Sequence, residues 1–147
     1  MKTNDYSRYM SPFSWRYGSE EMRKIFSEEN KYRLWRKVWV ALAKAQSKEG
    51  LVSKEELSDL EKNQNNIDIE RIWEIEKDTR HDVVAAIKEF AEKAKVGGGK
   101  IHLGATSMDI TDNVETVRIQ EALLLIEDEL KKLLKAFGQK IEKYADF

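Results

Sequence analysis

The sequence predicts an all-α protein, in which an N-terminal helical domain is followed by the first long helix of a central helical bundle. Pro12 is the single proline, so almost the whole chain lacks the residue that most strongly interrupts helices. Apolar residues recur at intervals of three and four along several segments, as they do on the buried face of a helix. We therefore expect residues 1–111 to form the N-terminal domain and residues 112–147 to begin the bundle.

Composition narrows the class of protein. The chain has 147 residues, of which 36% are charged and 41% hydrophobic, a balance typical of a soluble helical domain with a real core. A net charge of −1 gives no basis for bulk electrostatic binding to nucleic acid. No apolar run approaches the ~20 residues of a membrane span, and the polar N-terminus lacks the apolar core of a signal peptide. The absence of cysteine excludes disulfides and a thiolate nucleophile. We expect a cytoplasmic protein without nucleic-acid or membrane partners.

The first long helix is predicted between residues 27 and 49. Ser27 is a residue type that favours the N-cap position, and Gly50 follows where helices commonly end. The apolar positions between them are three or four residues apart, which predicts one buried stripe. This stripe comprises Trp35, Val38, Trp39, Leu42 and Ala45.

Two shorter helices and an irregular lead-in complete the first half of the chain. Residues 1–18 predict irregular structure, because they hold the proline and a glycine among several aromatic residues. Ser53 and Glu56 form a capping-box pattern, which opens a helix to about residue 62. The polar amides at 63–66 end that helix, and a further short helix is predicted over 70–76.

The second half of the chain predicts two longer helices joined by a loop at 101–111. The first begins near Arg80 or His81 and ends at Gly97–Gly99. Its expected buried face comprises Val84, Ile87, Phe90, Ala91 and Ala94. The second runs from about Asp112 to the end of the chain, with an apolar stripe of Ile119, Leu123, Ile126, Leu130, Leu133, Phe137, Ile141 and Tyr144. Such a stripe is typical of helical bundles, and we expect helices of a longer chain or of other subunits to cover it.

A cation, a titratable imidazole and a carboxylate lie side by side in Arg80-His81-Asp82, at a predicted helix start. Arg80 is a fixed cation suited to phosphate or carboxylate. His81 is able to give or receive a proton near neutral pH, and Asp82 to orient the ring or favour its protonated form. The alternative is a structural or solvated histidine, the commoner role of a lone histidine at a helix start.

Two hydroxyls lie in a glycine-containing loop before the last helix, in segment 102–107 (HLGATS). Thr106 and Ser107 are suited to hold a substrate carboxylate, on which charge builds up when a proton is removed beside it. In the alternative interpretation, the two hydroxyls cap the following helix. Asp109 and Asp112 are expected to cap and orient this loop.

Arg16 and Tyr17 place a guanidinium and a phenol in the lead-in, where they suit a phosphate group or, alternatively, anchor an ordinary loop.

Residues 97–100 (GGGK) are not a P-loop, because Ile101 occupies the required Ser/Thr position and no strand is predicted before them. His81 and His102 have no recognised metal-ligand spacing. The four tryptophans are interpreted as core residues rather than as a base-stacking platform. They are Trp15, Trp35, Trp39 and Trp73.

Three segments in register resemble the adenylosuccinate lyase family, within the fumarase/aspartase superfamily. Residues 16–22 (RYGSEEM) are similar to its N-terminal signature, and residues 80–83 (RHDV) to its first histidine segment. Residues 101–107 (IHLGATS), running into Asp112-Asn113, are similar to its next motif. Their order and spacing agree across nearly the whole chain, so the chain resembles the N-terminal portion of a family member.

The resemblance implies a homotetramer that needs no metal or redox cofactor. It implies β-elimination of fumarate from adenylosuccinate, giving AMP, and from the succinyl-aminoimidazole-carboxamide ribotide. Arg16-Tyr17 would contact the nucleotide phosphate, and Arg80-His81-Asp82 would line the substrate pocket. His81 would lie near the phosphate and assist the acid side of the reaction. Thr106-Ser107 would bind the succinyl or fumarate carboxylate.

The family's second histidine motif and its flexible serine loop, which supplies the general base, are expected beyond residue 147. Residues 1–147 alone are therefore expected to bind substrate weakly and not to turn it over. One alternative is carboxymuconate cycloisomerase or another superfamily lyase, although Arg16-Tyr17 and Arg80 favour the purine enzyme. The other is a non-catalytic helical binding or assembly module, which the uncovered stripe of the last helix motivates.

Overall fold

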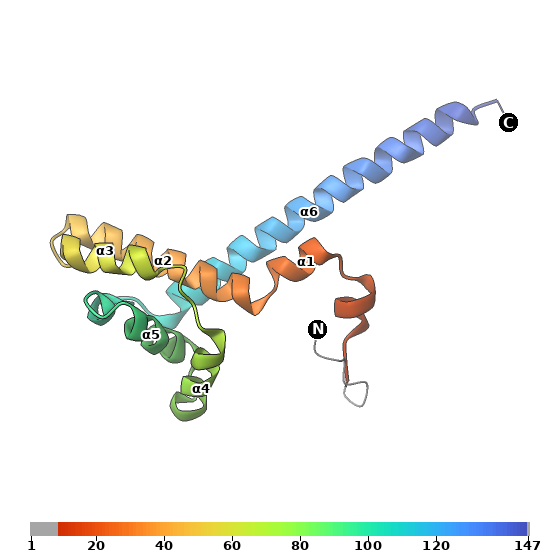
Figure 1. Cartoon of the computed structure of the whole chain (residues 1–147). Coiled ribbons are helices and arrows are strands. Elements are labelled where there is room, and N and C mark those ends of the chain that lie inside the picture. The colour runs from red at the N-terminus through yellow and green to blue at the C-terminus, as the bar shows by residue number, and fades with distance from the viewer. Residues whose placement is uncertain (1–8, 147) are drawn as a thin grey trace. The chain divides into compact units, whose positions relative to one another are not determined.

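The computed structural model describes residues 9–146, which form helices and no β-strand, as predicted (Figure 1). The elements are η1 (Phe13–Tyr17), α1 (Glu20–Ile25), α2 (Glu28–Lys48), α3 (Lys54–Asn63), α4 (Ile69–Thr79), α5 (Asp82–Lys93), η2 (Gly98–Lys100) and α6 (Ser107–Lys143). Ser27–Val117 forms one compact unit, and the described residues of Met1–Phe26 and Arg118–Phe147 form the other. The predicted domain boundary between residues 111 and 112 stays a prediction.

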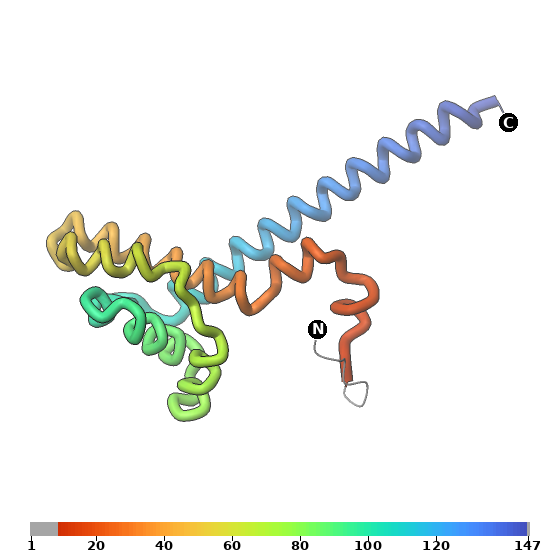
Figure 2. Tube along the Cα trace, in the orientation of Figure 1, coloured from red at the N-terminus to blue at the C-terminus, as the bar shows by residue number. Residues whose placement is uncertain are grey.

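Hydrogen bonds at the helix ends confirm the predicted caps. The Ser27 side chain accepts from the amide of Asn30 at 3.2 Å, and α2 ends before Gly50, whose φ of 76° is the left-handed conformation that glycine tolerates. In the capping box, Ser53 Oγ accepts from the Glu56 amide at 3.2 Å and Glu56 Oε2 accepts from the Ser53 amide at 2.7 Å. In Figure 2, the chain turns between α2 and α3, and α3 then runs back alongside α2.

Aromatic packing makes the core of the unit at 27–117. Trp35 lies edge-on to Tyr32 at 5.4 Å between ring centroids and to Trp39 at 6.0 Å. Trp15 and Trp73 are about half exposed, at 50% and 48%, so the prediction that all four tryptophans are core residues is wrong for these two.

The buried face of α2 is wider than the predicted stripe. Ala45 is exposed, while Val38 and Leu42 are only half-buried. The buried positions are Tyr32, Leu34, Trp35, Arg36, Trp39, Val40 and Ala43. The reason is that α3 and α4 both pack against α2, so burial follows two neighbours rather than one narrow stripe.

The buried face of α5 also differs from the prediction. Phe90 and Ala94 are buried as expected, but Val84, Ile87 and Ala91 are half-buried. The fully buried positions of the helix include Val83, Ala85, Ala86 and Glu89. The helix is therefore turned about its axis relative to the prediction, and this places the carboxylate of Glu89 in the core. A buried carboxylate is tolerated only when a cation pairs with it.

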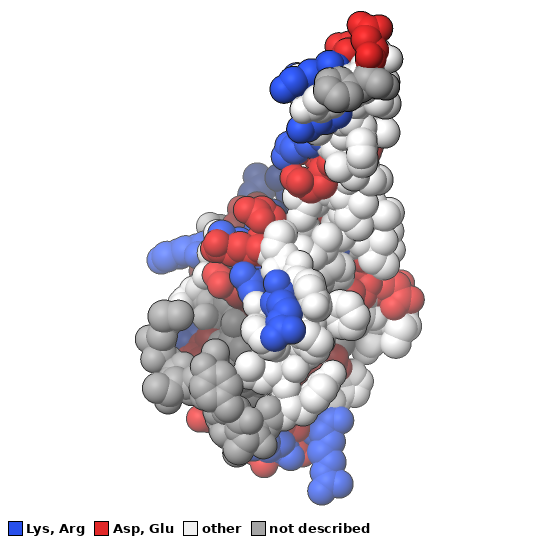
Figure 3. Space-filling view, turned by 90° about the vertical axis from the view of Figure 1, so that its right-hand side faces the viewer, with Lys and Arg blue, Asp and Glu red and all other residues white. Residues whose placement is uncertain are grey.

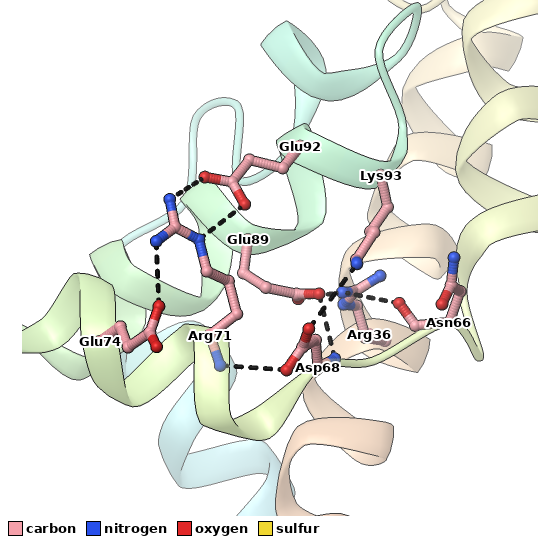
Figure 4. Close-up of polar contacts among 8 residues, drawn as sticks. All are labelled: Arg36, Asn66, Asp68, Arg71, Glu74, Glu89, Glu92 and Lys93. Carbon is pink, nitrogen blue, oxygen red and sulfur yellow. Dashed lines mark hydrogen bonds and ion pairs between the residues drawn. The ribbon is translucent and has the colours of Figure 1, made fainter.

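That cation is Arg36 of α2, which forms a buried ion pair with Glu89 (Figure 4). Both side chains are 1% exposed or less. The second oxygen of Glu89 accepts from the amide of Asp68 at 3.1 Å, and Arg36 also donates to the carbonyl of Asn63 at 3.0 Å. The guanidinium lies 3.6 Å above the Phe90 ring. These contacts join α2, α5 and the connection between α3 and α4.

Helix α5 ends at Lys93, four residues before the glycines that were predicted to end it. Beyond that end, Asp59 Oδ2 of α3 accepts from the amides of Val96 at 2.8 Å and Gly97 at 3.0 Å. The bond from the Gly97 amide is the main reason that the pKa of Asp59 is lowered. The glycine segment is thus held against α3 and is not a continuation of the helix.

Replacing Gly97 with alanine is expected to lower the free energy of unfolding by about 1–3 kcal/mol. A Cβ at Gly97 lies 2.5 Å from the carbonyl oxygen of Glu56 and 2.7 Å from Leu60 Cγ, so α3 must shift. Gly99→Ala is the control, since nothing lies within 4 Å of its Cβ position. Urea unfolding measures both variants; equal midpoints would contradict the close approach.

Helix α6 begins at Ser107, five residues before the predicted start at Asp112, so most of the predicted loop's second half is helical. In the unit that contains its later part, the Arg118 side chain donates to the carbonyl of Ile25 at 3.1 Å and lies 5.1 Å from the Phe26 ring. The short helix α1 (Glu20–Ile25) was not predicted, because it has too few turns to show an apolar period.

The predicted stripe of α6 is exposed in this chain. Its members are between 46% and 69% exposed, from Ile119 to Tyr144. Figure 3 shows uncharged side chains along one side of the C-terminal part of the helix and charged ones along the other. None of the described helices has both the length and the apolar character needed to cross a bilayer.

Candidate active site

The connection between α4 and α5 presents the segment Arg80-His81-Asp82. Arg80 follows the last residue of α4, and its amide donates to the carbonyl of Glu76 at 2.7 Å. Helix α5 starts close to the predicted position near Arg80 or His81: His81 is its N-cap and Asp82 its first residue. The short connection therefore places all three side chains at the N-terminal end of α5, where helix amides favour negative charge.

Two residues of the motifs have left-handed backbone conformations. Arg80 has a φ of 51° and His102 a φ of 64°, and they are the only non-glycine residues with positive φ between residues 9 and 146. Such conformations cost of order 1–3 kcal/mol for residues with a Cβ and cluster at functional sites. Their position inside the two motifs marks this region as a candidate site.

The His81 ring has two partners at its Nδ1 atom. Nδ1 lies 3.5 Å from the amide of Val84, from which it accepts as the helix cap, and 3.5 Å from Asp82 Oδ1. The first contact suits a neutral ring with its proton on Nε2, whereas the second suits a protonated ring. Asp82 is held in place because Oδ1 also accepts from the Val83 amide at 2.7 Å. The half-exposed imidazole therefore has a contact for each of its charge states.

Thr106 and Ser107 lie at the start of α6. The amide of Thr106 donates to Asp109 Oδ2 at 2.8 Å, so Asp109 caps this helix as expected. Asp112 does not cap the loop: it lies inside α6, and its Oδ1 accepts from the Thr111 hydroxyl at 3.1 Å. In the part of the chain that the structure describes, neither the Thr106 nor the Ser107 hydroxyl makes a hydrogen bond. Both are available to a ligand, and the capping by these hydroxyls that the alternative interpretation requires is not observed.

These two segments face one open hollow of about 650 Å³, within the range of small-molecule sites. Its lining residues are Glu76, Arg80, His81, Asp82, Val83, Thr106, Ser107, Met108 and Thr111. Five of the residues singled out from the sequence are thus brought together from segments more than twenty positions apart. Glu76 and Thr111 were not predicted as site residues, although each lies one helical turn from a motif residue.

Arg16 and Tyr17 belong to the other compact unit and lie in η1. The Arg16 guanidinium lies 4.6 Å from the centre of the Trp15 ring. Tyr17, which is 69% exposed, lines a separate and mainly apolar hollow of about 500 Å³ with residues of α6 such as Leu130. A role for Arg16 and Tyr17 at the site of His81 therefore stays a prediction.

His102 lies close to this site but is not among the residues that line the hollow. Its Nδ1 atom accepts from the indole Nε1–H of Trp39 at 3.1 Å. Burial lowers the pKa of His102, the nearby Asp109 carboxylate opposes this change, and the charge of His81 adds to it. His81 and His102 are therefore electrostatic neighbours in different local environments.

In the described part of the chain, which is helical, a histidine, an arginine, carboxylates and two unbonded hydroxyls surround one hollow, and such a set of groups is able to bind an anion and transfer a proton. The sequence profile of the lyase family matches residues 16–147, and the chain belongs to this family.

Several curated adenylosuccinate lyases are similar to the chain. That of Methanocaldococcus jannaschii is 44% identical over 136 residues, which cover 90% of this chain and 29% of that protein. That of Pyrococcus horikoshii is 39% identical, covering 90% of this chain and 30% of that protein. That of Saccharomyces cerevisiae is 36% identical, covering 97% of this chain and 30% of that protein. The chain thus spans about 30% of the length of these relatives.

Proposed function

We propose that this chain is the N-terminal part of an adenylosuccinate lyase. The reaction is β-elimination of fumarate from adenylosuccinate, giving AMP, and from the succinyl-aminoimidazole-carboxamide ribotide. Membership of the lyase family and relatives that carry this name support the proposal. We include in it the assembly inferred above, a cytoplasmic homotetramer in which other helices cover the apolar stripe of α6.

The observation that carries the proposal is the hollow between the start of α5 and the start of α6. It combines a cation, a proton-transfer group and two unbonded hydroxyls, from Arg80, His81, Thr106 and Ser107. A substrate that carries carboxylates and a basic leaving nitrogen needs this combination. Hydroxyl and guanidinium donors bind carboxylates, and an imidazole is able to protonate the nitrogen as it leaves.

The elimination divides between two ends of the substrate. A base removes a proton from the succinyl carbon, the electron pair forms the carbon–carbon double bond, and the carbon–nitrogen bond breaks with its electrons going to nitrogen. Charge builds up on the neighbouring carboxylate, where Thr106 and Ser107 donate hydrogen bonds that are fixed before the reaction. His81 assists protonation at nitrogen, and Asp82, whose Oδ1 lies 3.5 Å from His81 Nδ1, orients the ring.

The remaining parts of the reaction come from outside this hollow. The resemblance assigns the general base to a serine loop that is not among these motifs, and the nucleotide phosphate to Arg16 and Tyr17. The 147 residues alone are therefore expected to bind substrate weakly and to leave it unconverted.

The test is turnover of both substrates by the complete gene product, followed by ultraviolet absorbance. Replacing Thr106 and Ser107 together with alanine is expected to lower kcat/KM about tenfold or more, since each hydroxyl binds a charged group. Thr116→Ala is the control, because this exposed threonine of α6 bonds only its own helix, at the carbonyl of Asp112. Failure of the complete protein to convert either substrate would overturn the proposal.

A further inference from the structure

The indole of Trp39 determines which nitrogen of His102 carries the proton. Trp39 Nε1–H faces His102 Nδ1 at 3.1 Å, with the two rings almost perpendicular at 89°. An indole nitrogen only donates, so Nδ1 must offer its lone pair. The ring proton of neutral His102 is then on Nε2, and a proton on Nδ1 would cost this hydrogen bond.

Trp39 is held rigidly enough to impose this choice. It is 2% exposed, and its ring packs against Trp35 at 6.0 Å and Phe90 at 6.3 Å between centroids. His102 is constrained in turn by its left-handed backbone, with a φ of 64°. Neither ring is free to turn away without disturbing the core or the loop.

The groups that face His102 come from three elements. Trp39 of α2 presents a donor, Asp109 of α6 presents a carboxylate, and His81 at the start of α5 presents a second imidazole. Burial lowers the pKa of His102 and is the largest influence on it, ahead of the attraction of Asp109. The donor of Trp39 acts in the same direction as burial, because it occupies the position that a second ring proton needs.

We propose that Trp39 is a positioning residue that keeps Nδ1 of His102 unprotonated, so that His81 has no cationic neighbour at His102 when it gives up its proton at the hollow. The proposal rests on the proposed function for the use that His81 makes of its proton. His81 and His102 interact electrostatically, so two positive charges on them would repel each other. By excluding the charged form of His102, Trp39 keeps an acid available at the hollow between α5 and α6.

The first test measures the tautomer of His102 by nitrogen NMR of the labelled protein. In the unchanged protein, Nδ1 is expected to behave as the unprotonated nitrogen and Nε2 as the protonated one. Trp39→Phe removes the donor and is expected to shift the ratio of the two tautomers about fivefold toward Nδ1–H, the equivalent of one net hydrogen bond. It is also expected to raise the pH at which His102 titrates.

Trp35→Phe is the matched control. Trp35 is also 2% exposed, but its buried Nε1–H has no hydrogen-bond partner among the described residues. Phenylalanine at this position keeps an aromatic ring packed against Trp39, so this variant is expected to leave the tautomer and titration of His102 unchanged. Equal effects of the two substitutions would overturn the proposal, as would a proton on Nδ1 in the unchanged protein. The NMR measurement on the unchanged protein tests the proposal even if Trp39→Phe does not fold.

A second measurement separates this proposal from the proposed function. In the complete gene product, Trp39→Phe is expected to shift the pH profile of kcat/KM, whereas Trp35→Phe is not. If the protein converts neither substrate, the proposed function fails while the tautomer measurement still stands. If it converts them and both variants have the same pH profile of kcat/KM, the proposed role of Trp39 in keeping His102 neutral is wrong.

Discussion

Replacing His81 with alanine is expected to lower kcat/KM of the complete lyase by about 10²–10⁴ without changing its assembly. The size of the effect follows from the loss of a proton-transfer group in a site that retains its cation and hydroxyls. Arg80, Thr106 and Ser107 still line the hollow, and under the proposed function they are still able to bind the anionic substrate. The loss is therefore expected mainly in kcat, which steady-state kinetics measures alongside sedimentation of the variant.

His81 is also the N-cap of α5, so the control must keep that role. Its Nδ1 contact with the Val84 amide is long, at 3.5 Å, and its removal is expected to cost little stability. His81→Asn supplies a favourable N-cap acceptor without a group that transfers protons near neutral pH. The asparagine variant is expected to be as stable as the parent and as inactive as His81→Ala. Near-normal turnover in either variant would remove His81 from the mechanism.

The site was predictable to the extent that it depends on local chemistry. The caps at Ser27 and Ser53 follow from residue types over three or four positions, and the structure contains them, as it does the helix start predicted near Arg80 or His81. Arg80-His81-Asp82 and Thr106-Ser107 each combine reactive types within a few residues. That the two segments face the same hollow depends on how α5 and α6 start, which no local pattern encodes.

Contacts across long sequence separations were not predictable from one sequence. Trp39 donates to His102 across 63 positions, and Arg36 pairs with Glu89 across 53. Both Arg36 and Glu89 read as ordinary solvated charges on amphipathic helices. They are buried because α2 and α5 each pack on more than one side, and a period of three and four residues describes only one apolar face.

Replacing Glu89 with glutamine is expected to lower the free energy of unfolding by about 3 kcal/mol. The substitution keeps the shape of the side chain but leaves the Arg36 guanidinium buried without an opposing charge. Its remaining contacts are the carbonyls of Asn63 and Asn66 and the ring of Phe90. Burial already raises the pKa of Glu89 and lowers that of Arg36, so desolvation disfavours both charges and only their pairing maintains them.

An exposed carboxylate on the neighbouring helix provides the comparison. Glu74 of α4 pairs with Arg71 at 3.2 Å, and its side chain is 61% exposed (Figure 4). Glu74→Gln is expected to change the free energy of unfolding by no more than about 0.5–1 kcal/mol, because water screens this pair. Urea unfolding with unchanged m-values measures both variants. Equal effects at Glu74 and Glu89 would contradict the burial of the Arg36–Glu89 pair.

Removing the charges of both Arg36 and Glu89 shows whether the pair itself stabilises the fold or whether only the loss of one partner is costly. Arg36→Met combined with Glu89→Leu is expected to be much less destabilised than Glu89→Gln alone, since apolar residues of similar volume need no charged partner. The amide of Asp68 and the carbonyl of Asn63 lose their bonds in that variant, so it is not expected to exceed the parent. If removing one charge costs more stability than removing both, the pair adds little net stability. Its role is then to fix how α2 packs against α5. Because His81 is the N-cap of α5, that same contact helps to set the position of the imidazole at the hollow.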